Sequence, residues 1–171
     1  MKRVFELIVW FSAMLLIAEG YGNTLQRMPI APNGQTIIEG RLHKHNVKVT
    51  IETHIVQIGK PSDKRPVRVN SSCTYSRYPC SLVDSIDITV SGSPIRIPRS
   101  VFCDLADLNS ATINEEKKRL LLTLTGGDAS ESYIMKIEFD TQRVRKRSLF
   151  SGESNRLLQE TTYYQVVIDG D

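Results

Sequence analysis

Apolar and polar residues alternate along three separate stretches of this chain, which cover residues 47–55, 82–90 and 133–139. In the first stretch, valine, isoleucine and threonine occupy the odd positions, whereas lysine, threonine, glutamate and histidine occupy the even ones. A period of two places successive side chains on opposite faces of an extended backbone. Each stretch is therefore predicted to be a half-buried β-strand.

Further segments between turn signals are predicted to be strands, and the last of them is rich in β-branched and aromatic residues, which favour a pleated sheet. They cover residues 36–42, 95–97, 120–125, 143–150 and 157–168, with residues 67–70 as a further short candidate. Residues 100–109 differ, because Val101, Leu105 and Leu108 would fall on one face of a helix. The serine that begins this segment and the asparagine that ends it can cap and close one short helix.

About seven strands with turn residues between them are typical of an all-β protein. A chain of about 150 residues, once a leader is removed, is long enough for one domain with its own core. The pattern predicts a single antiparallel β-sandwich or open barrel that covers residues 36–171, with one short helix near 100–109.

The start of the chain has the order of a secretory signal peptide, which is basic, then apolar, then rich in small residues. The apolar run covers residues 7–18, whereas roughly 20 apolar residues are needed to span a bilayer. We therefore expect residues 1–22 to be removed on export. The mature protein is expected to be secreted or periplasmic, without a stable membrane anchor. Residues 23–35, which contain two prolines and an Asn-Gly pair, are predicted to be a flexible N-terminal arm.

Charge and known motifs narrow the function classes further. The formal net charge of +3 is too small to indicate nucleic-acid binding. Two histidines, His43 and His45, lie close together but lack a third ligand in an obvious register, so no metal is predicted. The sequence contains neither a phosphate-binding loop nor a serine nucleophile elbow, and it implies no cofactor. Catalysis by two neighbouring carboxylates remains an alternative interpretation.

Three cysteines in an exported chain allow one internal disulfide and leave one thiol. In the chain-entropy model, a disulfide between Cys73 and Cys80 stabilises the folded state by about 2 kcal/mol. A disulfide between Cys80 and Cys103 would stabilise it by about 1 kcal/mol more. This difference does not decide between the two pairings. The short loop is favoured, because Cys103 stands among apolar neighbours and resembles a small buried hydrophobe.

The loop between these cysteines is the first candidate binding site, because it concentrates Tyr75, Arg77 and Tyr78 within four residues. Tyrosine and arginine are enriched among the residues that dominate protein interfaces. In the alternative interpretation, the loop only connects two strands and its tyrosines cover the end of the core.

A basic run supplies the second candidate, because Arg143, Arg145 and Arg147 would project from one face of a strand. Such a face can meet an anionic surface, for example lipopolysaccharide, a heparin-like glycan or an acidic protein. In the alternative interpretation, the charges protect a solvated edge strand from aggregation. A glycosylation sequon, Asn70-Ser71-Ser72, has meaning only in a host that glycosylates exported proteins.

These observations predict an exported β domain, monomeric or weakly associating, with a binding or structural role. Its partner would be a protein or an anionic surface. An exported hydrolase with paired carboxylates is the alternative, and an inhibitor of a foreign enzyme is a variant of the binding role.

Overall fold

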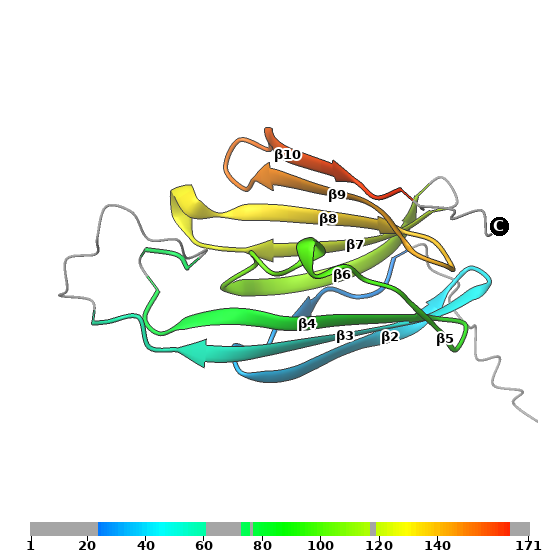
Figure 1. The fold of residues 1–171 in the computed structure, drawn as a ribbon, viewed down its shortest axis with the longest axis horizontal. Coiled ribbons are helices and arrows are strands. Elements are labelled where there is room, and N and C mark those ends of the chain that lie inside the picture. The colour runs from blue at the N-terminus through cyan, green and yellow to red at the C-terminus, as the bar shows by residue number, and fades with distance from the viewer. Residues whose placement is uncertain (1–23, 61–72, 76, 117–118, 165–171) are drawn as a thin grey trace, which may run out of the picture.

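A computed structural model describes residues 24–60, 73–75, 77–116 and 119–164. The fold is a β-sandwich of two antiparallel sheets that remain open at their edges (Figure 1). The predicted signal peptide, the short strand at 67–70, the sequon and the end of the last predicted strand lie outside the described residues. Among the described residues, no helix has the length and apolarity that crossing a membrane requires.

The smaller sheet contains four strands in the order β2-β3-β4-β5. These strands are β2 (Gly34–Leu42), β3 (His45–Val56), β4 (Cys80–Val90) and β5 (Ser93–Ile95). Two-residue turns connect β2 to β3 and β4 to β5. In the second of these turns both Ser91 and Gly92 have positive φ angles, of 52° and 84°, which is the backbone twist that tight hairpins favour.

The larger sheet contains six strands in the order β1-β6-β7-β8-β9-β10. These strands are β1 (Met28–Pro29), β6 (Leu108–Glu116), β7 (Arg119–Gly126), β8 (Tyr133–Phe139), β9 (Val144–Ser151) and β10 (Leu157–Thr162). Two 3-10 turns, η1 (Arg99–Val101) and η2 (Ala129–Glu131), lie in the connections. Each strand from β6 to β10 pairs with its neighbour in sequence, so the sheet is a meander to which β1 adds an edge.

The core lies between the two sheets and is built from the inward residues of the alternating strands. Its fully buried members include Val49 and Ile51 on β3, Leu122 and Leu124 on β7, and Ile137 on β8. The predicted alternation on β3, β4 and β8 is confirmed, and so is the all-β fold class. The open edges of both sheets correspond to the sandwich rather than to a barrel.

The predicted helix at 100–109 is wrong. The segment contains only the three-residue turn η1, and from Leu108 onward it forms β6. Between them, the chain pairs with the start of β4, since the amide of Val83 donates to the carbonyl of Leu105 and the amide of Asp107 donates to that of Ser81. Val101 and Leu105 are buried as a helix would have buried them, so helical spacing here reflects packing between sheets.

The predicted flexible arm also requires correction for its described part. The amide of Leu25 donates to the carbonyl of Ile113, and β1 pairs with β6. Ile30, 7% exposed, packs into the core. Pro29 fits an edge strand, which has one side without a ladder partner and tolerates the missing amide hydrogen.

Candidate functional site

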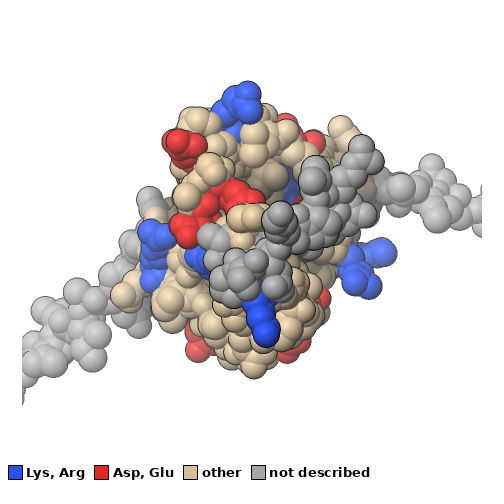
Figure 2. Space-filling view, turned by 90° about the vertical axis from the view of Figure 1, so that its left-hand side faces the viewer, with Lys and Arg blue, Asp and Glu red and all other residues tan. Residues whose placement is uncertain are grey.

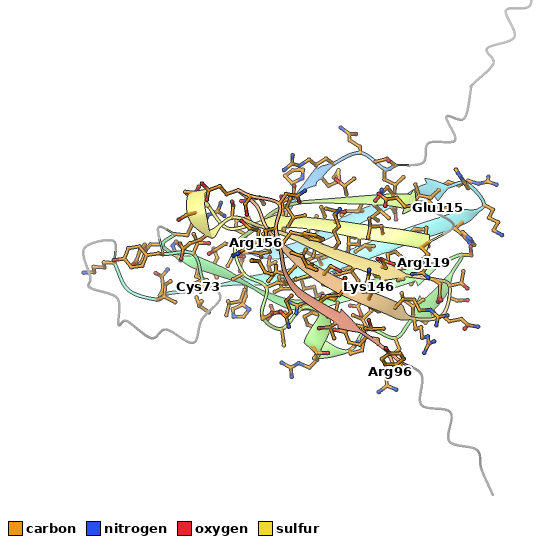
Figure 3. All side chains as sticks on the ribbon, turned by 90° about the horizontal axis from the view of Figure 1, so that it is seen from above. Cys73, Arg96, Glu115, Arg119, Lys146 and Arg156 are labelled. Atoms are coloured by element: carbon orange, nitrogen blue, oxygen red, sulfur yellow. A yellow bond between two sulfur atoms is a disulfide. The ribbon has the colours of Figure 1, made fainter. Side chains whose placement is uncertain are left out.

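A disulfide between Cys73 and Cys80 marks one end of the sandwich, on the left of Figures 1 and 3. The predicted pairing is confirmed, with 5.6 Å between the two Cα atoms. The same end carries the connections from β7 to β8 and from β9 to β10 (Figure 1). Cys103 is a free thiol, and it is exposed rather than buried as its neighbours in sequence suggested.

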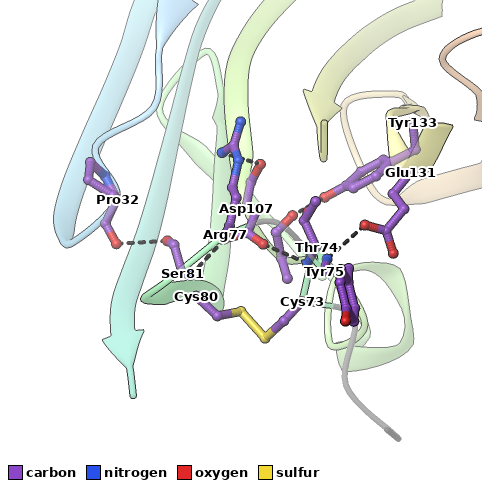
Figure 4. The surroundings of a disulfide bond; sticks show 11 residues. Pro32, Cys73, Thr74, Tyr75, Arg77, Cys80, Ser81, Asp107, Glu131 and Tyr133 are labelled. Atoms are coloured by element: carbon purple, nitrogen blue, oxygen red, sulfur yellow. Dashed lines mark hydrogen bonds between the residues drawn. A yellow bond between two sulfur atoms is a disulfide. The ribbon is translucent and has the colours of Figure 1, made fainter. Parts of the chain in front are cut away.

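Asp107 fixes the disulfide loop to the body of the domain (Figure 4). Its side chain is buried, and one carboxylate oxygen accepts a hydrogen bond from the amide of Thr74 at 2.8 Å. The other oxygen accepts one from the amide of Ser81 at 2.9 Å. These two amides directly follow the two bridged cysteines, so a single carboxylate holds both ends of the loop.

Arg77 lies in this loop and binds inward to the neighbouring strands. One terminal nitrogen donates to the carbonyl of Asp107 at 3.3 Å. The other donates to the side-chain oxygen of Asn109 at 2.6 Å and to the carbonyl of Gly127 at 3.3 Å. Arg77 was predicted as a contact residue, and these bonds give it a positioning role within the loop.

Tyr75 is the exposed member of the loop, with 59% of its surface accessible, whereas Tyr78 is half-buried. The backbone amide of Tyr75 donates to a carboxylate oxygen of Glu131 at 2.7 Å. This bond links the disulfide loop to η2, the turn between β7 and β8. The structure therefore exposes one aromatic side chain to solvent, on a backbone that hydrogen bonds to Asp107 and Glu131 hold in place.

A hollow of about 480 Å³ adjoins this loop, between the segment after η1 and the inner side of β8 to β10. Its lining includes Asp104, Glu131, Tyr133, Arg147, Arg156 and Leu158. Figure 2 views this end of the molecule and shows acidic side chains gathered near its centre.

Tyr133 forms part of the floor of the hollow, and its hydroxyl donates to the carbonyl of Ala106 at 2.6 Å. Burial raises the pKa of this hydroxyl above its ordinary value of 10, so it remains a donor at neutral pH. A Cβ atom at Gly126 would lie 2.4 Å from the tyrosine ring. Gly126 thus has a packing role, because the absence of a side chain leaves the space that the ring occupies.

The basic run of the sequence does not form one exposed face. Arg147 pairs across the sheet with Ile137 and is 3% exposed, on the core side of β9. Its guanidinium donates to both carboxylate oxygens of Asp104, at 2.7 and 2.5 Å. Arg145 occupies a bulge and pairs with Asp140, while Arg143 precedes the strand and is half-buried.

Comparison of the chain with protein-family models, with curated proteins and with solved structures finds no match. Within the described ranges, no group of three or more His, Cys, Asp or Glu side chains could hold a metal ion.

The sequence did not indicate Asp107, Glu131 or Tyr133 as parts of this end. Their partners lie 26 to 56 residues away along the chain, so no local spacing links them. Only the residue type at Asp107 agrees with its local backbone. The φ angle there is 50°, and aspartate tolerates this left-handed conformation better than most residues.

A network of charges, also missed, covers the outer face of the larger sheet. Glu138 binds both Arg119, at 2.9 Å, and Lys146, at 3.1 Å, and Lys146 also binds Glu160 at 3.4 Å. Burial alone would raise the pKa of Glu138, but the hydrogen bonds from Lys146 and Arg119 lower it overall. The pKa of Asp140 is likewise lowered, because hydrogen bonds from the amides of Gln142 and Arg143 and from Arg145 outweigh its burial.

Acidification should therefore destabilise the protein. A carboxyl group whose pKa is lower in the folded state stabilises that state fully when the pH is above the ordinary pKa of the group. The ordinary pKa is 4.5 for Glu138 and 3.8 for Asp140. This contribution disappears as the pH falls through the lower folded pKa. We expect the urea midpoint to fall between pH 6 and pH 3, as monitored by circular dichroism. The fall should be smaller in Glu138→Gln than in Glu39→Gln, and an equal fall in both variants would contradict this assignment.

Removing the disulfide should lower the free energy of unfolding by about 2 kcal/mol, because the unfolded chain gains the freedom of the opened loop. The double variant Cys73→Ser/Cys80→Ser tests this by urea denaturation. Cys103→Ser is the matched control and should leave stability unchanged, since this thiol is exposed and unbridged. A comparable loss in the control would show that the effect does not come from the bridge.

Proposed function

We propose that this protein is an exported binding domain that recognises a protein partner through its disulfide end. The observation that carries the proposal is the presentation of Tyr75, which is 59% exposed on a backbone tied by a disulfide and by hydrogen bonds to Asp107 and Glu131. An ordered loop avoids a cost of about 0.5 to 1.5 kcal/mol for each side chain that binding would otherwise immobilise. Tyrosine also combines a large contact area with a hydrogen-bonding group.

Export is supported by the internal disulfide, which is typical of proteins in oxidising compartments, and by the order of residues 1–22. Mass spectrometry of the exported fraction tests it directly. The chain should begin at Tyr21 or Asn23, and recovery of the full-length chain in the cytosol would contradict export.

The binding role is tested with Tyr75→Ala, in which only the exposed side chain changes. The tagged variant should stay folded and lose the protein that the unmodified domain captures from the exported fraction. Tyr164→Ala is the matched control, because Tyr164 is 84% exposed and lies on the chain just after β10, far from the disulfide loop. Arg77 is unsuitable for this test, since its removal would break bonds inside the protein.

Three results are informative in this comparison. Selective loss in Tyr75→Ala supports recognition at the disulfide end. Equal capture by all three proteins would refute it and leave the loop as a connection. A captured enzyme whose activity the domain reduces would identify the partner as the target of an inhibitor.

Catalysis by paired carboxylates gains no support from the charge network. A general acid needs a raised pKa, and the flanking cations shift the pKa of Glu138 in the opposite direction.

A further inference from the structure

Strand β10 forms a free edge of the larger sheet. It is last in the strand order, and Figure 1 shows it as the outermost strand on its side of the molecule. Each of its residues is exposed except Thr161, which is half-buried. Within the described ranges, no strand pairs with its outer side. An unpaired edge is a template for a further strand.

The direction of the backbone groups along β10 follows from one hydrogen bond. The amide of Tyr163 donates to the carbonyl of Arg145, so the backbone of Tyr163 points towards β9. Backbone groups alternate in direction along a strand in an antiparallel pair. The amides and carbonyls of Glu160, Thr162 and Tyr164 therefore point away from β9 and are available to a second strand.

The other edges of the sandwich are less suited to pairing. β1 and β5 have only two and three residues, and each contains a proline, which cannot donate to a ladder. β2 has nine residues, but it contains two glycines and the charged residues Glu39 and Arg41. Charged side chains protect an edge, and glycine weakens a strand. β10 has one charged residue and neither proline nor glycine.

Apolar surface accompanies the β10 edge. Six large apolar side chains are exposed in the described part of the chain, and three of them lie here. Leu157 and Leu158, 48% and 50% exposed, stand at the start of the strand, and Tyr164, 84% exposed, follows its end. Antiparallel pairing of two identical strands would bring the apolar start of each alongside the apolar end of the other. The edge is therefore complementary to itself.

We propose that two copies of this chain associate through antiparallel pairing of their β10 strands, with both Thr161 residues on the two-fold axis. In this register Glu160 of one copy lies opposite Thr162 of the other, and both belong to the set whose backbone points outward. Leu158 comes level with Tyr164, so both ends of the edge are paired. Threonine pairs across strands are favourable, whereas an axis at Glu160 would place two carboxylates directly opposite each other.

Analytical ultracentrifugation of the full-length mature protein at low ionic strength tests the proposal. A short edge buries little surface, so we expect a reversible monomer–dimer equilibrium with a dissociation constant of about 10 µM to 1 mM. A protein that stays monomeric throughout that range would overturn the proposal and leave the edge free for a strand of a different protein. A dimer that disappears in Cys103→Ser would be linked through the free thiol, and would also overturn it.

Two substitutions at position 162 test the register. Thr162→Glu places like charges opposite each other at two symmetric points, so it should weaken the dimer about tenfold. Within one copy the new carboxylate stands across from Lys146, which favours the folded state. Thr162→Lys instead faces Glu160 of the second copy, and it should dimerise at least as tightly as the unmodified protein. Equal weakening in both variants would overturn the register.

Ile37→Glu is the matched control, because it adds the same charge on β2, the other long edge strand, at a side chain that is 40% exposed. It should leave the dissociation constant unchanged. Equal weakening in Ile37→Glu and Thr162→Glu would show general charge repulsion. Weakening in Ile37→Glu alone would place the contact on β2. Either result would overturn the proposal.

Amide hydrogen exchange, followed by NMR at low and high protein concentration, tests the pairing without a variant. The amides of Glu160 and Thr162 should exchange more slowly at high concentration, while that of Tyr163, already bonded to β9, should not change. Equal exchange of Glu160 and Thr162 at both concentrations would overturn the pairing. Dimerisation is independent of the proposed partner site, and Tyr75→Ala should leave the dissociation constant unchanged, so the two proposals can fail separately.

Discussion

Replacing Asp107 with alanine should lower the free energy of unfolding by about 3 to 5 kcal/mol. The substitution leaves the amides of Thr74 and Ser81 without their acceptors, and an unsatisfied buried donor costs about 1 to 3 kcal/mol. Alanine must also adopt the positive φ of 50°, which adds about 1 kcal/mol. Urea denaturation followed by circular dichroism measures the change.

Asparagine at position 107 separates these contributions, because it tolerates the left-handed backbone and retains one acceptor oxygen. Asp107→Asn should lose about half as much stability as Asp107→Ala. A loss below about 1 kcal/mol in the alanine variant would show that the carboxylate does not anchor the loop. If the anchor also serves recognition, Asp107→Asn should bind the captured partner more weakly even where it remains folded.

The strands that could be predicted from the sequence are those in which one face is buried and the other is exposed to solvent. On β3 and β8 the alternation of residue types follows directly from the position between core and solvent. It failed at residues 100–109, where Val101 and Leu105 are buried by pairing with β4 and by packing between sheets. Helical spacing of a few apolar residues does not distinguish a helix from an irregular segment that is covered on two sides.

The candidate site could be predicted only in part, for a related reason. The disulfide and its tyrosines are close in sequence, and so the loop could be identified from composition. The groups that order the loop, Asp107 and Glu131, arrive through long-range pairing of β6 and of the β7 to β8 turn. The basic run was misjudged because a single bulged residue, Arg145, reverses the side on which the following arginine projects.

Because of that reversal, the charged side chain of Arg147 lies on the core side of the sheet. Its neighbour Gln159 accepts one hydrogen bond at 3.3 Å, and Asp104 accepts two from the other terminal nitrogen. The Nε atom has no partner within the described residues. Among the residues that the structure describes, the carboxylate of Asp104 is thus the one acidic group that pairs with this buried cation.

Asp104→Asn should therefore lower the free energy of unfolding by about 3 kcal/mol, since removing one partner leaves an uncompensated charge in the interior. Glu160→Gln is the matched control, because it removes a carboxylate from an ion pair on the exposed face of the same sheet and should cost less than about 1 kcal/mol. Thermal and urea denaturation measure both changes. The double variant Asp104→Asn/Arg147→Met should recover part of the loss, since methionine needs no partner and fills a similar volume. If the double variant were instead less stable than Asp104→Asn alone, the arginine would contribute through its packing and its bond to Gln159 rather than through the ion pair.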